Sequence, residues 1–171
     1  MSEFKETFNN LKLIVAVDKE GGFSKNHKIP WHFKEDLQFF KRTTENSTCI
    51  MGRNTYEEIL NMKKNKIGDI LPNRQSIVIS KSLKYLRDEG ENDRLVNSFP
   101  DAIYKSKNDR IFIIGGEKLY IQTLPFVNEV YMTIINGKYN CDMKFPISYL
   151  KNFKVEELGH FDNGIFVKYY R

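Results

Sequence analysis

Short apolar runs alternate with amphipathic stretches along most of this chain. Runs rich in branched apolar residues indicate strands, and we predict them at 11–17, 48–51, 75–80, 110–114 and 129–135, with a weaker one at 95–98. Apolar residues at helical spacing predict helices at 33–44, 54–62, 100–106 and 117–124. The segments 153–157 and 165–170 lie near the turn sequence Asp162-Asn163-Gly164, so we predict that they close the fold as an antiparallel pair.

Nearly continuous apolar strands that lie between helices are typical of a mostly parallel sheet covered on both faces. We therefore predict a single α/β domain over residues 1–171, with a central sheet of about eight strands, an antiparallel pair at its C-terminal edge and helices on both faces. Residues 1–10 form an N-terminal extension that we expect to be flexible. In such sheets, ligands bind beyond the carboxyl ends of the strands.

One carboxylate interrupts the apolar pattern of the first predicted helix. Phe33, Leu37 and Phe40 fall at i, i+4 and i+7, which places them on one face of the helix. Asp36 lies three residues after Phe33 and four before Phe40, so it points into the same face. A charge in that position is costly unless it has a partner or a function. We infer that Asp36 lines a half-apolar pocket and binds a polar ligand there.

Three predicted strands end in groups that can bind anions. Gly115-Gly116 stands between a strand and a helix, where it forms either a tight turn or a cradle for phosphates. Gly52-Arg53-Asn54-Thr55 repeats this layout, and Asn54 or Thr55 can cap the following helix. Ser80-Lys81 ends a third strand with a hydroxyl and an ammonium group. Together on one rim, these groups suggest a ligand with several phosphates, such as a dinucleotide.

The segment from Gly21 to Trp31 is long, begins with glycine and ends in an apolar anchor. It is either an ordinary surface loop or a lid over the site, and the chain's single Trp favours a lid. Arg74 follows Leu71-Pro72-Asn73 and is either a surface arginine or a fork for a ligand carboxylate. Thr133 is ordinary in a strand, but its hydroxyl could support Asp36 across the sheet.

Composition narrows the class of protein. The 171 residues are 40% hydrophobic and 29% charged, as in a soluble globular protein. No apolar run approaches the roughly 18 residues that span a membrane, and residues 1–6 lack the apolar core of a signal peptide, so we expect no membrane association and a cytoplasmic location.

Basic residues are scattered along the chain, with the densest group at 63–66, which disfavours binding to nucleic acid. Cys49 and Cys141 form no framework and the histidines show no metal spacing, so we expect no metal, and a monomer is the default.

Taken together, these residues resemble dihydrofolate reductase. The match covers roughly residues 11–146 in the same order, with weaker agreement toward the C-terminus. The segments that carry it are Ile14-Val15-Ala16-Val17, Ile29-Pro30-Trp31 with Asp36 five residues on, Ile50-Met51-Gly52-Arg53-Asn54-Thr55, Leu71-Pro72-Asn73-Arg74, Ile113-Ile114-Gly115-Gly116, and Asp142 ahead of Phe145-Pro146.

The resemblance implies that NADPH reduces 7,8-dihydrofolate to tetrahydrofolate, with hydride passing from the nicotinamide to C6 and a proton reaching N5 with the help of Asp36. It implies a catalytic group of Asp36, Trp31 and Thr133. The implied substrate-binding residues are Ile14, Val15, Asp36, Leu37, Phe40, Ile59, Leu71, Arg74, Ile114 and Thr133, where Arg74 holds the glutamate α-carboxylate. The implied cofactor-binding residues are Ala16, Gly22, Phe23, Ser24, Lys25, Asn26, Gly52, Arg53, Asn54, Thr55, Ser80, Lys81, Ile114, Gly115, Gly116, Glu117, Lys118, Leu119, Tyr120 and Gln122. By their charge, Arg53 and Lys81 favour the 2′-phosphate of NADPH over NADH.

The chain departs from the family's usual sequence at several positions. The lid often reads Gly-Ile-Gly, where this chain has Gly22-Phe23-Ser24, and some relatives have Gly in place of Cys141 or Trp in place of Tyr56. Two other functions share these features: the reduction of another pterin or of a ribosylated pyrimidine on the same fold, and a non-catalytic nucleotide-binding module. Asp36 in its apolar face and Arg74 argue against the first, and the lack of a clustered basic stripe argues against a nucleic-acid-binding form of the second.

Overall fold

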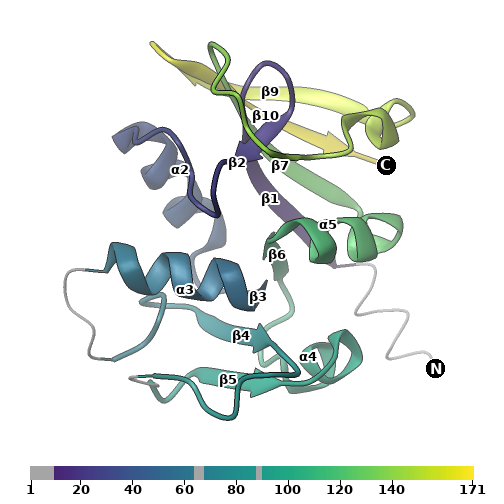
Figure 1. The fold of residues 1–171 in the computed structure, drawn as a ribbon. Helices are drawn as coiled ribbons and strands as arrows, with labels where there is room; N and C mark the ends of the chain where they lie inside the picture. The colour runs from purple at the N-terminus through teal and green to yellow at the C-terminus, as the bar shows by residue number, and fades with distance from the viewer. Residues whose placement is uncertain (1–9, 64–67, 88–89) are drawn as a thin grey trace.

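A central sheet of eight strands organises the protein (Figure 1). The computed structural model describes residues 10–63, 68–87 and 90–171. In sheet order, the strands are β5 (Asp93–Val96), β4 (Gln75–Ile79), β3 (Thr48–Gly52), β6 (Ile111–Gly115), β1 (Leu11–Val17), β7 (Glu129–Ile135), β10 (Gly164–Tyr170) and β9 (Lys154–Phe161). The α-helices of the described residues are α2 (Lys34–Thr44), α3 (Arg53–Met62), α4 (Phe99–Lys105) and α5 (Glu117–Thr123).

The strand pairing confirms the predicted sheet. Strands β5, β4, β3, β6, β1 and β7 are mutually parallel, and β10 pairs antiparallel with both β7 and β9. The turn at residues 162–163 joins β9 and β10 as predicted. Strand β9 ends at Phe161, four residues beyond the predicted end at 157. The carboxyl ends of the parallel strands β1, β3, β4 and β6 therefore lie along one edge of the sheet.

Alternating side chains along the inner strands fill two hydrophobic clusters, one on each face of the sheet. Leu13 and Ile113 pack with residues of α4 and α5, whereas Ile14 and Phe112 pack with residues of α2 and α3. Figure 1 shows the same division, with α2 and α3 to one side of the strands and α4 and α5 to the other. This alternation in a sheet buried on both faces explains why its strands read as continuous apolar runs.

A second, smaller sheet was not predicted. Strand β2 (Gly22–Ser24) pairs antiparallel with β8 (Met143–Lys144), which ties the segment after β1 to the segment after β7. These strands have three and two residues, too few to show a period in the sequence. The short 3₁₀ helices η1 (Leu124–Phe126) and η2 (Ile147–Leu150) complete the elements.

Several predicted boundaries differ from the structure. Strand β5 begins at Asp93 and ends at Val96, whereas the prediction ran from 95 to 98. The predicted cap of α3 is wrong: Gly52 is the N-cap residue, no side chain caps the helix, and Asn54 and Thr55 lie inside its first turn. The predicted N-terminal extension, apart from residue 10, and residues 64–66 of the basic loop lie outside the described residues. No helix in the described part of the chain has the length and apolar character needed to cross a membrane.

Candidate active site

Two cavities lie at the carboxyl ends of the parallel strands and share a wall. The first, of about 490 Å³, is lined mainly by apolar residues of α2, α3 and the segment before β4, and we call it the apolar cavity. The second, of about 530 Å³, contains Gly52, Gly115 and Gly116, and we call it the glycine-lined cavity. The residues that line both cavities form what we call the shared wall: Val15, Ala16, Ile29, Thr55, Glu58, Ile114 and Tyr120.

Asp36 lines the apolar cavity from the first turn of α2. Burial raises the pKa of its carboxyl, and the side chains of Thr133 and Trp31 partly oppose that rise. Thr133 is buried on β7, and Trp31 is buried at the end of the segment that precedes α2. The Trp31 indole lies close enough to influence Asp36, but its Nε1 makes no hydrogen bond of ordinary length and angle within the described structure. Asp36 is therefore a partly buried carboxylate beside an unpaired donor.

The face of α2 that carries Asp36 faces the apolar cavity. Leu37 is 51% exposed, and both Leu37 and Phe40 line that cavity. The residue that enters the core is Phe39, which is 5% exposed and stacks on Phe166 with ring centroids 4.3 Å apart. Asp36 shares a half-apolar cavity with Leu37 and Phe40, and their binding of a ligand there stays a prediction. Leu37 is exposed because it faces this open cavity and no neighbouring element of the described structure packs on it.

Arg74 lines the same cavity and is only 7% exposed. Its Nε donates to the Pro72 carbonyl at 3.0 Å and its Nη1 to the Thr44 hydroxyl at 3.1 Å. Its guanidinium carbon lies 5.7 Å from the centre of the Phe40 ring. Burial lowers the pKa of this guanidinium, and no carboxylate of the described residues forms an ion pair with it. A buried arginine without an anionic partner is suited to bind a carboxylate of a ligand.

Close backbone packing forms the floor of the glycine-lined cavity. Gly115 ends β6 with φ of +130°, and the peptide bond between Gly115 and Gly116 is cis. A Cβ on Gly115 would lie 2.9 Å from the Thr55 hydroxyl oxygen, and a Cβ on Gly52 would lie 3.8 Å from the Gly116 nitrogen. The lack of side chains at the ends of β3 and β6 thus leaves room for a ligand to approach the backbone.

Tyr120 of α5, a residue of the shared wall, joins β1 and β6. Its hydroxyl lies 3.0 Å from the Ile14 carbonyl and 2.9 Å from the Ile114 carbonyl. Complete burial raises the pKa of this phenol, and the nearby Glu58 carboxylate raises it further. Tyr120 therefore stays neutral and acts as a donor to the main chain.

Comparison with known proteins points to one family. The family model for dihydrofolate reductase matches residues 10–165. A dihydrofolate reductase of Ureaplasma parvum is 35% identical over 160 residues, covering 94% of this chain and 96% of its own length. Dihydrofolate reductases of Buchnera aphidicola (subsp. Acyrthosiphon pisum) and Bacillus subtilis are 39% and 32% identical, and each alignment covers about four fifths of both chains (80% and 79%; 85% and 80%). The chain belongs to the dihydrofolate reductase family.

Most of the residues that the dihydrofolate reductase resemblance assigned to the two ligands lie at the cavities. Every predicted substrate residue lines the apolar cavity: Ile14, Val15, Asp36, Leu37, Phe40, Ile59, Leu71, Arg74, Ile114 and Thr133. Most predicted cofactor residues line the glycine-lined cavity: Ala16, Phe23, Ser24, Gly52, Arg53, Asn54, Thr55, Ile114, Gly115, Gly116, Glu117, Lys118, Leu119, Tyr120 and Gln122. The structure thus brings together residues that lie more than a hundred positions apart in the sequence.

Five predicted cofactor residues lie away from the lining of the glycine-lined cavity. Lys25 and Lys81 are exposed. The Ser80 hydroxyl accepts hydrogen bonds from the backbone nitrogens of Ser82 and Leu83 at 3.2 and 3.1 Å, so it stabilises the turn after β4. Gly22 lies inside β2, and Asn26 binds the Asp142 carboxylate through its backbone nitrogen. Their assignment as cofactor residues of a dihydrofolate reductase remains a prediction.

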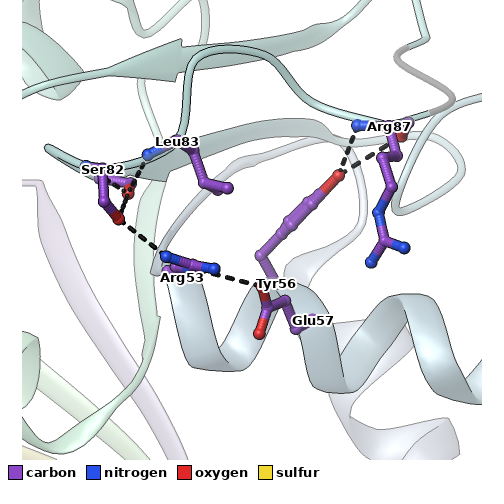
Figure 2. A network of polar contacts seen from close by, with 7 residues as sticks. Arg53, Tyr56, Glu57, Ser82, Leu83 and Arg87 are labelled. Atoms are coloured by element: carbon purple, nitrogen blue, oxygen red, sulfur yellow. Dashed lines mark hydrogen bonds and ion pairs between the residues drawn. The ribbon is translucent and has the colours of Figure 1, made fainter.

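Arg53 stands at the mouth of the glycine-lined cavity and is already hydrogen-bonded (Figure 2). Its Nε lies 3.0 Å from a Glu57 carboxylate oxygen, and its Nη1 donates to the Ser82 hydroxyl at 2.8 Å. One turn along α3, the Tyr56 hydroxyl binds the main chain of Arg87, which attaches the helix to the segment after β4 (Figure 2). Arg53 is therefore held in place by protein groups at a surface position.

The segment 21–31, which we call the lid, is pinned to the loop before β8. Its residues Phe23 and Ser24 line the glycine-lined cavity, as expected of a cover. Asp142 accepts a hydrogen bond from the Asn26 nitrogen at 2.9 Å and donates its own nitrogen to the Ser24 carbonyl at 3.1 Å. The lid tip is a tight turn, because Lys25 and Lys28 pair and the residues between them, Asn26 and His27, have φ of +51° and +62°.

Gly22 and Cys141 fit together at the base of the lid. A Cβ on Gly22 would lie 2.4 Å from the Cys141 Cβ, so the glycine leaves the space that the cysteine fills. Both residues adjoin Asp18, which is 2% exposed and accepts hydrogen bonds from the backbone nitrogens of Glu20, Gly22 and Tyr139 at 2.9, 2.9 and 3.0 Å. Burial raises the pKa of Asp18, but these donors outweigh that effect and hold it below the ordinary value. The cysteine at position 141, where some relatives have glycine, thus fills the space left by the missing side chain of Gly22.

Some lining residues were missed by sequence reasoning. Glu58 is the most informative, because it lines both cavities and carries a charge. It lies three residues after the predicted site residue Thr55, so helical spacing places the two on the same face of α3. Further lining residues without a predicted role are His27, Ile29, Ile79 and Met143 in the glycine-lined cavity and Phe39, Lys41, Met62, Lys63, Ile70 and Pro72 in the apolar cavity. Within the described structure, no group of three or more His, Cys, Asp or Glu could hold a metal ion.

Proposed function

We propose that this protein catalyses the NADPH-dependent reduction of 7,8-dihydrofolate to 5,6,7,8-tetrahydrofolate. The observation that carries the proposal is the position of Asp36, a partly buried carboxylate in an apolar cavity that shares a wall with a glycine-lined cavity. A reaction between a flat polar ring and a dinucleotide needs two adjoining sites of these two kinds. Membership of the dihydrofolate reductase family supports the same substrate.

The apolar cavity fits a folate. Leu37, Phe40 and Ile59 offer flat apolar walls, and Asp36 accepts hydrogen bonds from the amino group and ring nitrogen of a pterin. Arg74 completes the fit at another part of the lining, because its buried guanidinium has no carboxylate partner among the described residues and the tail of a folate ends in carboxylates. A ribosylated pyrimidine has no carboxylate to offer Arg74.

The glycine-lined cavity fits a dinucleotide phosphate. Gly52, Gly115 and Gly116 expose the main chain, and the first amides of α3 have no side-chain cap, so they can donate to phosphate oxygens. Arg53 at the cavity mouth, together with Lys81, which precedes the Ser82 that Arg53 contacts, supplies positive charge for the 2′-phosphate that distinguishes NADPH from NADH. When bound, NADPH supplies the hydride that reduces C6 of the substrate.

In this proposal, Asp36 binds the pterin and assists the transfer of a proton to N5. Its raised pKa means that the carboxyl holds a proton to a higher pH than an exposed aspartate does, whereas the Thr133 hydroxyl favours the ionised form and fixes its orientation. The residue can therefore pair with the pterin and help a proton reach N5 at neutral pH. The Trp31 indole lies beside the same group and likewise favours its ionised form.

A spectrophotometric assay of cofactor oxidation tests the proposal. We expect turnover with NADPH and dihydrofolate, a lower kcat/KM with NADH, and no turnover with a ribosylated aminopyrimidine. Turnover with the pyrimidine alone would assign the protein to the other class of reductase. Binding of NADPH without turnover of any of these substrates would indicate a non-catalytic nucleotide-binding module. We also expect a cytoplasmic monomer, which size-exclusion chromatography with light scattering tests for oligomeric state.

A further inference from the structure

Glu58 is a charged residue in the shared wall to which the reaction proposed above gives no role. It lies on α3, is partly buried, and lines the apolar cavity, the glycine-lined cavity and a third cavity of about 420 Å³. Burial raises the pKa of its carboxyl. A partly desolvated carboxylate at this position is costly unless it holds something in place.

The lid supplies its partners. One carboxylate oxygen of Glu58 accepts a hydrogen bond from the backbone nitrogen of Ile29 at 2.8 Å. Coulombic interactions with His27 and Lys28 of the lid, and with His32 just after it, favour its ionised form. The other titratable neighbour is Tyr120, which stays neutral because it is buried and bonded to carbonyls. Glu58 thus meets the lid through one charge-assisted hydrogen bond and a set of favourable charges.

The lid tip is therefore held by carboxylates on both sides. Asp142 binds the Asn26 nitrogen at 2.9 Å on one side of the turn, and Glu58 binds the Ile29 nitrogen at 2.8 Å on the other. Between these points the chain makes a tight turn with two residues at positive φ, a conformation that non-glycine residues adopt at a cost. Two external hydrogen bonds to main-chain donors are a physical reason for that turn to persist.

We propose that Glu58 is a positioning residue that clasps the lid tip to α3 and so fixes Ile29 in the wall between the two cavities. Ile29 lines both cavities, so its position defines where the two ligands meet. Release of Ile29 would widen that wall and loosen the cover of the glycine-lined cavity, which Phe23 and Ser24 of the same lid also line. The clasp itself needs no ligand, and only its kinetic consequence rests on the proposed function.

Amide hydrogen exchange of Ile29 in the full chain tests the clasp directly. We expect Glu58→Ala to speed exchange at Ile29 by about tenfold or more, since it removes a hydrogen bond to a charged acceptor. Glu58→Gln keeps an acceptor oxygen but loses the charge, so its exchange rate should lie between wild type and Glu58→Ala. The amide of Ile113, in the buried strand β6, serves as an internal reference and should be unchanged. The control Glu157→Gln makes the same chemical change at an exposed position of β9 and should alter neither amide.

The separate changes in KM and kcat of the Glu58 variant provide a second test. In Glu58→Ala we expect the KM for NADPH and for dihydrofolate to rise together by about fivefold to tenfold, with a smaller change in kcat, because the wall serves both ligands. Unchanged Ile29 exchange in Glu58→Ala would overturn the proposal, as would equal acceleration at Ile29 and Ile113, which would indicate general destabilisation. If wild type shows no turnover, the proposed function fails, whereas the exchange experiment still decides whether the clasp exists.

Discussion

The two cavities that meet at Ile29 offer different groups to a ligand, side chains in one and the main chain in the other. In the apolar cavity, charged side chains in apolar surroundings do the binding, and two of them, Asp36 and Arg74, have no ionic partner among the described residues. In the glycine-lined cavity the main chain is exposed because side chains are absent at Gly52, Gly115 and Gly116. The first site is therefore sensitive to the removal of a side chain, and the second to the addition of one. The following variants test this contrast.

The largest effect is expected at Asp36. Asp36→Asn keeps the shape of the side chain but cannot hold or release a proton, so kcat/KM for dihydrofolate at pH 7 should fall by about 10²-fold or more, within the range for loss of a general acid–base group. NADPH affinity, measured by fluorescence titration, should stay within about twofold because Asp36 does not line the glycine-lined cavity. Normal dihydrofolate reduction by Asp36→Asn would remove the residue from the mechanism.

The same variant should be at least as stable as wild type at neutral pH. Because the pKa of Asp36 is raised in the folded protein, the native state binds this proton more tightly than the unfolded chain, and the free energy of unfolding falls as pH rises through that pKa. Asparagine does not ionise, so Asp36→Asn avoids that loss. We expect Tm to be about 1–3 °C higher than wild type at pH 7, with the difference shrinking below the ordinary carboxyl pKa. A lower Tm for the variant at pH 7 would contradict this.

The next effect is expected from a methyl group at Gly115. Gly115→Ala must place a side chain at positive φ and against the Thr55 hydroxyl, so we expect a loss of about 2–4 kcal/mol in unfolding free energy and weaker NADPH binding. Gly68→Ala is the matched control, because Gly68 also has positive φ, of +88°, but nothing lies within 4 Å of its Cβ position. Equal costs for the two variants, measured by chemical denaturation, would show that the close packing of the glycine-lined cavity contributes nothing.

Replacement of Arg74 should separate the two ligands. Arg74→Leu removes the buried fork, so dihydrofolate affinity should weaken by about 10- to 100-fold while NADPH affinity changes little. Arg110→Leu is a control at an arginine that, like Arg74, contacts the end of α2, here through the Thr43 carbonyl, but does not line either cavity. Isothermal titration with each ligand decides the matter, and equal weakening of both ligands by Arg74→Leu would exclude Arg74 from a site specific to the folate tail.

The smallest effect is expected at the base of the lid. Gly22→Ala introduces a Cβ into the space of Cys141, and we expect it to cost about 1–2 kcal/mol of stability. Cys141→Gly in the same chain should restore most of that loss, which a double-mutant cycle on unfolding free energies measures. Additive effects of the two substitutions would show that Gly22 and Cys141 are not coupled.

Sequence patterning singled out Asp36 because its side chain violates a pattern, and the family resemblance supplied most of the other residues of the apolar cavity. A carboxylate on an apolar helix face is visible in the sequence, and the physical cost of burying it points to a ligand. Glu58 was missed although it lies on the face of α3 that carries Thr55, because two consecutive glutamates, Glu57 and Glu58, are typical of an exposed helix surface. The structural role of Glu58 depends on its hydrogen bond with the lid residue Ile29, which lies 29 positions earlier in the chain.

Other differences arise from local competition for hydrogen bonds. Ser80 was expected to bind an anion, but its hydroxyl accepts the nitrogens of the following turn, a bond that a polar side chain can always form locally. Arg53 was expected to face a phosphate, and it stands at the cavity mouth bound to Glu57 and Ser82. A sequence pattern identifies groups able to bind an anion but not which of them the protein itself already engages.

The sequence by itself determined the alternation of strands and helices, the two-faced burial of the sheet and the exceptional position of Asp36, because hydrophobic periodicity and the cost of a buried charge act over a few neighbouring residues. Only the tertiary structure decided that Phe39 enters the core, that Arg74 is buried without an ionic partner in the described structure, and that Glu58 meets the lid. These outcomes depend on which distant parts of the chain pack against a given helix face and which do not. Local periodicity of the sequence contains no information on such long-range contacts.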